Sequence, residues 1–237
     1  PLMNPGAMQF FDLLEEEPAP QLEISLNSNL GVSFNKTDRM LNRVHSLLEQ
    51  KKIKKFRLFT SIDTWGPQAE YMRTGLNLEH WERNLKKALS MGFEVTIMCT
   101  FNVLCVTNFK SLLYKMIEWR KEFGDVINID TPHLKEPPHW MINILPESFL
   151  TYMDDTLDFI DSNKDNFRVS EYEKFKRVTN YMKSNPVSKE KILQGQRDFY
   201  SFFTENDKRL GTNLLETFPE YTEFYNYCKG VYKSYDK

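Results

Sequence analysis

The chain has 237 residues, of which 41% are hydrophobic and 27% are charged, and its formal net charge is −2. This length suits one α/β domain with an appendage, or one large domain. The charge balance lacks the basic excess of proteins that bind nucleic acid or acidic membrane surfaces. No apolar run approaches the roughly 18–20 residues that a membrane span needs, and the first residues lack the basic start and apolar core of a signal peptide. The three cysteines form no CxxC pair and no even disulfide framework, which favours a reducing, cytoplasmic setting.

The first part of the chain alternates predicted helices with predicted strands. Asn4 before Pro5 is typical of a helix start, and Pro18 is expected to stop that helix. Alternating apolar residues predict strands over residues 22–26, 56–62, 93–101 and 126–129. Helices are predicted over residues 37–50, after a cap at Asn77 with an end at Gly92, and after a cap at Asn108 with an end at Gly124.

The spacing of these elements predicts a parallel sheet. Strands recur at intervals of roughly 35 residues with a helix between them, as in repeated βαβ units. This order alone does not separate a doubly wound sheet from a barrel, and four strands are too few to close a barrel of eight, so an incomplete barrel is one of the alternatives.

The predicted secondary structure changes after Pro146. Polar, aromatic helices are predicted over residues 147–163, 168–184 and 195–209, and no further strand is predicted. We therefore expect two parts, an α/β part over residues 1–146 and a helical extension over residues 147–237.

Polar side chains follow each predicted strand. Asn27, Ser28 and Asn29 end the first strand, Ser61 and Asp63 the second, Thr100 and Asn102 the third, and Asp130 and His133 the fourth. The carboxyl ends of parallel strands meet at one edge of a sheet, where α/β proteins place their ligands. These side chains are predicted to share a pocket for a polar small molecule. The alternative is that each one forms a loop or caps a helix.

Several segments together resemble the radical S-adenosylmethionine enzymes. Residues 61–73, SIDTWGPQAEYMR, resemble that family's SIDG…YxxxR segment, and the opening PLMNPG resembles the continuation of its Gly-Gly-Glu-Pro motif, with Pro1 as the final residue. NSNLG (27–31) is similar to its TNG-like segment, and TFNVL (100–104) to its fifth-strand Asn segment. IDTPHLKEPPHW (129–140) and RLGTNLLETFPE (209–220) resemble the subgroup that carries an accessory twitch domain.

The resemblance implies a partial (β/α) TIM-like barrel that binds S-adenosylmethionine beside a 4Fe–4S cluster. Such enzymes reductively cleave S-adenosylmethionine to a 5′-deoxyadenosyl radical, which modifies a substrate. The family's cluster ligands form a CxxxCxxC motif, which this chain does not contain. The chain is therefore expected to be the carboxyl-terminal part of such an enzyme, inactive alone, with an electron donor and an unidentified small molecule or peptide as partners.

The resemblance also assigns roles to individual positions. Ser61 and Asp63 would lie near the ribose, Arg73 would hold the methionyl carboxylate with its guanidinium fork, and Asn102 would approach the adenosyl group. Ser28 and Asn29 replace the Thr-Asn of the TNG-like segment. Leu30 and Thr64 stand where the family has glycine, so both turns are expected to differ.

Two other hypotheses remain open at the level of sequence. Asp130, His133 and His139 could make a metal site with open positions, which would suggest a metal-dependent hydrolase or lyase. The acidic residues Asp154, Asp158 and Asp161 share one helix face and could bind a cation, although such a face is more often solvated. Alternatively, the fold serves as a non-catalytic module that binds a peptide or another partner.

Overall fold

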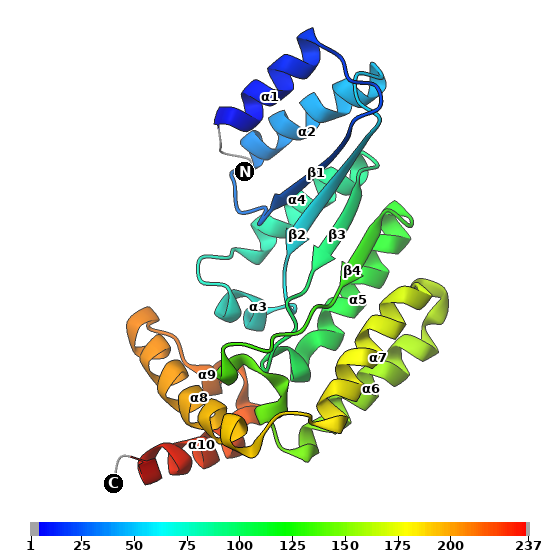
Figure 1. The fold of residues 1–237 in the computed structure, drawn as a ribbon. Helices are drawn as coiled ribbons and strands as arrows, with labels where there is room; N and C mark the ends of the chain where they lie inside the picture. Colours follow the sequence, from blue (N-terminus) through cyan, green and yellow to red (C-terminus); the bar gives the residue numbers. More distant parts are fainter. Residues whose placement is uncertain (1–4, 236–237) are drawn as a thin grey trace. The chain divides into compact units, whose positions relative to one another are not determined.

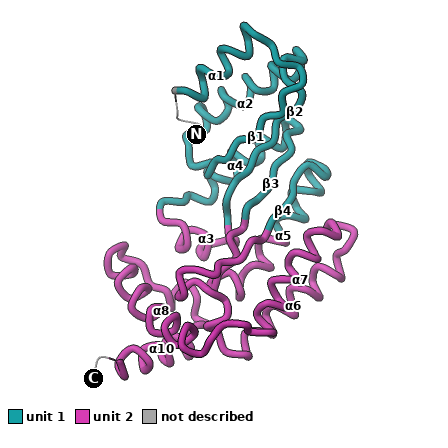
Figure 2. The backbone as a smooth tube through the Cα atoms, in the orientation of Figure 1, with its two compact units in different colours: residues 1–62, 75–98, 115–130 teal, residues 63–74, 99–114, 131–237 magenta. Residues whose placement is uncertain are grey.

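The structure is a computed structural model in which residues 5–235 are described, and it contains two compact units. Figure 2 colours them separately: the first comprises residues up to Ile62, 75–98 and 115–130, and the second comprises residues 63–74, 99–114 and 131 onward. The chain therefore leaves the first unit after each of three strands and contributes a segment to the second.

The first unit contains a parallel four-stranded sheet, and its strands follow one another in the order β1-β2-β3-β4. Figure 1 shows the four arrows running in the same direction. The elements of this unit are α1 (Pro5–Glu16), β1 (Glu23–Ser28), α2 (Phe34–Glu49), β2 (Lys55–Ser61), α4 (Leu78–Ser90), β3 (Glu94–Met98), the second half of α5 (Cys105–Phe123) and β4 (Ile127–Asp130). The predicted α/β class and parallel sheet are confirmed.

One face of this sheet is buried and the other is not. Along β2, Phe56, Leu58 and Thr60 are buried, whereas the residues between them are partly exposed, and β3 and β4 alternate in the same way. Right-handed crossovers between strands that add in one direction place every connecting helix on the same face. A doubly wound sheet instead reverses its strand order and is covered on both faces.

The buried face holds two tryptophans that fix the helices to the strands. Trp81 of α4 donates from Nε1 to Thr60 Oγ1 over 3.1 Å, and its ring lies 6.0 Å from that of Trp119 in α5. Trp119 donates from Nε1 to Glu82 Oε1 over 3.0 Å. Both indoles are fully buried with their N–H groups satisfied, so the large rings stabilise the core at no polar cost.

The open face carries charges that pair across the strands. Arg57 of β2 lies between Glu23 of β1, at 3.4 Å, and Glu94 of β3, at 3.3 Å. Lys55 also pairs with Glu94, at 2.6 Å. These partly exposed pairs contribute little to stability, but they show that this face of the sheet is built for contact with polar surroundings.

The second unit is mainly helical. Its helices are α3 (Pro67–Met72), the first half of α5, α6 (Leu150–Ser162), α7 (Val169–Ser184), α8 (Lys189–Leu210), α9 (Leu214–Thr217) and α10 (Thr222–Tyr235), with short 3-10 helices at Pro138–Trp140, Ile142–Ile144, Glu147–Phe149, Lys164–Asn166 and Pro219–Tyr221. Aromatic contacts join α8 to α10, with Phe199 5.1 Å from Phe224 and Tyr200 5.1 Å from Tyr225. Figure 1 shows these two helices at the carboxyl-terminal end of the chain.

Some predicted boundaries were wrong for identifiable reasons. The α5 helix begins at Cys105 rather than after Asn108, because the Asn108 side chain turns away to donate to Trp65 O over 2.8 Å. Helices α3 and α10 were not predicted from their sequences. The expected domain division after Pro146 stays a prediction, and that position lies inside the second unit. The predicted cap at Asn4 lies outside the described residues. Within the part of the chain that the structure describes, no helix is long and apolar enough to cross a membrane.

Replacing Asn84 by Ala is expected to destabilise the protein by about 2 kcal/mol, because a buried carbonyl would lose its donor. The Asn84 amide donates to Leu30 O and to Val32 O over 2.8 Å each, so it holds the loop that follows β1. Urea denaturation measures the free energy of unfolding. The matched control is Asn42→Ala, which removes an exposed contact to Asp38 on α2 and should change that free energy by less than about 0.5 kcal/mol. Equal effects of the two substitutions would contradict the role given to Asn84.

Candidate functional site around Asp63

Asp63 organises the segments that follow two of the strands. Its Oδ2 lies 2.8 Å from Arg73 Nε, and its Oδ1 accepts a hydrogen bond from Thr100 N over 2.8 Å. Cys99 Sγ lies 3.4 Å from the Asp63 carbonyl oxygen. One carboxylate therefore joins residues 63–73, which follow β2, to residues 99–100, which follow β3.

Because Asp63 is buried, the charge of its carboxylate depends on the groups that contact it. The Asp63 side chain is 8% exposed and that of Arg73 is 29% exposed. Burial raises the pKa of Asp63 above its usual value, and the nearby Arg73 charge and the Thr100 amide oppose that rise. The raised pKa means that the Asp63 carboxyl group binds its proton more tightly in the folded state than in the unfolded state. The positive charge of Arg73 favours the ionised form of this buried carboxylate.

A second pair of hydrogen bonds reinforces the junction. Thr64 Oγ1 donates to Asn108 O over 2.8 Å, and the Asn108 side chain donates to Trp65 O over 2.8 Å. Thr64 stands where the resembled family has glycine, and its hydroxyl gives this turn a specific partner that glycine lacks.

Asn102, predicted to approach an adenosyl group, forms a turn of its own loop. Its Oδ1 accepts from Leu104 N over 3.0 Å, and its Nδ2 donates to Thr100 O over 3.0 Å. Asn102 and Asp63 thus act on the same loop, since both bond to Thr100. Both polar ends of the Asn102 amide are engaged within residues 100–104.

The remaining predicted site residues lie in the first unit. Ser28 ends β1, and its Oγ accepts from Leu30 N over 3.1 Å, whereas Asn29 Oδ1 accepts from Gly31 N over 3.1 Å. Leu30 has a φ of 50°, the left-handed region in which glycine is favoured. Ser61 ends β2 on the open face of the sheet, opposite Met98. Pro1 lies outside the described residues.

Two of the segments that carry the resemblance, or residues next to them, contact each other, which their sequences do not indicate. Tyr71 donates from its hydroxyl to Asp207 Oδ1 over 2.8 Å, and Gln68 Nε2 donates to Thr217 O over 3.0 Å. Asp207 also accepts from Thr212 Oγ1 and Leu214 N, each over 2.7 Å. Burial and the Asp207 carboxylate raise the pKa of Tyr71 well above its usual value, so the phenol stays a hydrogen-bond donor.

A polar cavity of about 560 Å³ lies beside this contact. Its walls come from α3 and from the segment around α9 and include Pro67, Glu70, Tyr71, Gly211, Thr212, Asn213, Glu216 and Thr217. One indication in the sequence links these segments, since residues 61–73 and 209–220 both resemble the same family. Neither segment contains a pattern that predicts a contact with the other.

The cysteines do not fit an iron–sulfur cluster. Cys99, Cys105 and Cys228 are all free and fully buried. Burial raises the pKa of Cys99 well above its usual value and that of Cys228 to about 12, which disfavours the thiolate that binds iron. Cys105 Sγ instead accepts from Asn102 N over 3.3 Å. These residues fill the core rather than ligate a metal.

The two histidines of the metal hypothesis each contact an aromatic ring. The His133 ring lies 4.5 Å from that of Tyr181, and the His139 ring stacks on Phe202 at 4.5 Å. On the acidic helix face, Asp154 pairs with Lys183 at 2.6 Å. Across residues 5–235, no three His, Cys, Asp or Glu side chains form a group that could hold a metal ion.

Comparisons with models of protein families, with curated proteins and with solved structures found no match for this chain. The fold itself defines an α/β protein. It has a parallel sheet whose strands lie side by side in chain order, and a helical unit. Its function has to be argued from the Asp63 site.

Replacing Arg73 by Met is expected to destabilise the protein by about 2–3 kcal/mol at pH 7, because the ionised Asp63 would be left buried without its cation. The loss should shrink as the pH falls and Asp63 takes up a proton. Adding Asp63→Asn to Arg73→Met should restore most of the stability, since the neutral amide has no charge to compensate. Denaturant titrations at pH 7 and pH 5 measure these differences. A double variant that is as unstable as the sum of the two single variants would exclude a direct interaction.

The half-buried histidines His133 and His139 are expected to make the protein less stable in mild acid. Burial lowers the pKa of His133 and of His139 below the usual value, and Lys135 lowers that of His133 further. The unfolded chain then binds more protons than the folded chain, so the free energy of unfolding falls as the pH drops below about 6.5. Thermal unfolding between pH 7.5 and 5 measures this slope. The variant with His133→Gln and His139→Gln should have a shallower slope than the unsubstituted protein, and an equal slope would show that neither group titrates with folding.

Proposed function

We propose that this chain is part of a radical S-adenosylmethionine enzyme of the twitch-domain subgroup, and that it supplies the side chain that grips the methionyl end of S-adenosylmethionine. The observation that supports this function is the buried Asp63–Arg73 pair, at 2.8 Å, in the segment that resembles the family's SIDG…YxxxR motif. A partly exposed arginine can recognise a ligand carboxylate, and the buried Asp63 carboxylate fixes where this arginine lies.

The sheet supports the proposal independently of these side chains. Its strand order β1-β2-β3-β4 and its single covered face are features of a sheet that winds in one direction, as a barrel does. Its partly exposed polar face corresponds to the interior of an incomplete (β/α) barrel. As expected from the sequence, we assign residues 1–146 to such a partial barrel.

Arg73 and Asp63 have different roles in this proposal. The Arg73 side chain is partly exposed and contacts Asp63 through Nε, and in this proposal its terminal amino groups bind the ligand carboxylate. Asp63 and the Thr100 amide position Arg73 rather than touch the ligand, because both carboxylate oxygens are already engaged. Ser61 and Asn102 stay predicted contacts of the adenosyl part, and Ser28 and Asn29 stay predicted cofactor-binding residues.

The cluster chemistry belongs to residues outside 1–237. A cysteine-bound 4Fe–4S cluster supplies the electron for reductive cleavage of S-adenosylmethionine, and none of its ligands is among the residues of this chain. The proposal therefore includes a cluster-binding segment elsewhere, an electron donor, a reducing cytoplasmic setting and an unidentified small-molecule or peptide substrate.

Binding of S-adenosylmethionine tests the proposal, in the protein that carries the cluster segment together with residues 1–237. Arg73→Ala should weaken binding in equilibrium dialysis by about tenfold or more, as loss of a charge-assisted contact does. The affinity of Arg73→Lys should lie between those of the unsubstituted protein and Arg73→Ala, because an ammonium group lacks the planar fork of a guanidinium. Arg39→Ala, which removes an exposed arginine of α2, is the matched control and should leave binding unchanged. Unchanged binding in Arg73→Ala and Asp63→Ala would overturn the assignment and favour a non-catalytic binding module.

A further inference from the structure

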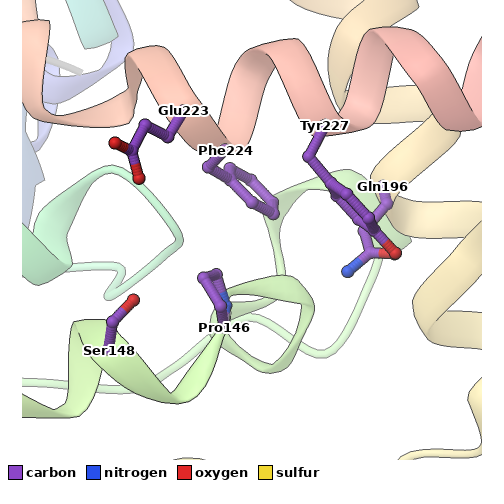
Figure 3. A pocket seen from close by; sticks show the side chains of 6 residues that line it. All are labelled: Pro146, Ser148, Gln196, Glu223, Phe224 and Tyr227. Atoms are coloured by element: carbon purple, nitrogen blue, oxygen red, sulfur yellow. The ribbon is translucent and has the colours of Figure 1, made fainter.

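A second cavity lies in the helical unit, apart from the residues of the Asp63 site. It has a volume of about 430 Å³ and is lined by Pro146, Ser148, Gln196 of α8, and Glu223, Phe224 and Tyr227 of α10 (Figure 3). Pockets for small organic ligands have volumes of about 300–1,000 Å³ and combine apolar walls with a few polar groups. This cavity has both properties.

Gln196 provides a hydrogen-bond acceptor in the wall of this cavity. The residue is 9% exposed, and its Nε2 donates to Ile144 O over 2.9 Å. Its Oε1 is buried and has no hydrogen-bond partner among the described residues. A buried acceptor without a partner costs about 1–3 kcal/mol, and a ligand N–H group that paired with it would relieve that cost.

The position of Gln196 is fixed by close packing next to it. A Cβ at Gly195 would lie 2.6 Å from Ile144 Cγ2 and 2.8 Å from Pro138 O. The absence of that atom lets α8 approach the segment 138–144 closely, which brings Gln196 Nε2 to Ile144 O. The amide is thus held in one orientation before any ligand arrives, which reduces the entropy lost on binding.

The remaining polar groups of the cavity also accept hydrogen bonds. Glu223 contributes a carboxylate, Ser148 and Tyr227 contribute hydroxyl oxygens, and no lysine or arginine is among the six lining residues. Figure 3 shows Glu223 and Ser148 at one end of the view, Gln196 and Tyr227 at the other, and Phe224 and Pro146 between them. A complementary ligand has an ammonium group at one end, an apolar chain, and an N–H donor at the other end.

We infer that this cavity binds a lysine residue of a peptide, with the ammonium group at Glu223, the alkyl chain along Phe224 and Pro146, and a backbone amide N–H directed to Gln196. The aromatic ring of Phe224, which lies between the two ends of the cavity, adds an attraction for the cation. This site is independent of the proposed function at Arg73. A negative result for lysine binding would not affect the proposal for Arg73, and a negative result at Arg73 would not affect the lysine site.

The test uses Nα-acetyl-lysine N-methylamide as the probe and Nα-acetyl-norleucine N-methylamide as its neutral counterpart, which has a methyl group in place of the ammonium. Residues 1–237 labelled with ¹⁵N are titrated with each. We expect saturable shifts of the Gln196 side-chain amide resonance, with the lysine probe binding about fivefold more tightly, the difference typical of an exposed ion pair.

Glu223→Gln should abolish that preference without altering the fold, because Glu223 is exposed. The matched control is Glu205→Gln, an exposed glutamate of α8 that does not line the cavity, and it should preserve the preference. Equal affinity for the two probes, a preference that survives Glu223→Gln, or saturation without any shift of the Gln196 resonance would each overturn the proposal, as would the absence of saturable binding.

Discussion

The ion pair between Asp63 and Arg73 is the contact on which the candidate site depends. Asp63 is held by the Thr100 amide as well, and Thr64 and Asn108 exchange bonds with the neighbouring backbone. The segments after β2 and β3 are therefore one joined structure rather than two separate loops. A buried carboxylate has few tolerable arrangements, so this pair determines where the guanidinium of Arg73 is presented.

The sequence was informative about the sheet because each strand and helix has a strong local pattern. Alternating apolar residues placed all four strands, and the Asn77 cap is present, with its side chain accepting from His80 N over 2.7 Å. Helix α3 was not predicted because its six residues are too few to show a periodic pattern, and its contacts include a distant one, from Tyr71 to Asp207. Helix α10 does have an amphipathic pattern, with Phe224 and Cys228 buried four residues apart, so its sequence contained a local signal that was overlooked.

The candidate site was predictable in part. Asp63 and Arg73 come together, whereas the pocket expected to be shared by the polar residues after the strands stays a prediction. The local hydrogen bonds of Ser28, Asn29 and Asn102 were not foreseen, although short polar side chains commonly form such turns. Leu30 shows the limit most clearly, since its left-handed backbone follows from its buried side chain and from the Asn84 amide rather than from its residue type.

The central claim is that these residues belong to an enzyme whose cluster ligands lie outside 1–237. The most direct measurement is to determine the coding sequence that flanks the codons of this chain. The account predicts an in-frame Gly-Gly-Glu immediately before Pro1, preceded by a CxxxCxxC motif that follows an apolar strand. A natural protein that contains residues 1–237 without such a motif anywhere in its sequence would contradict the account.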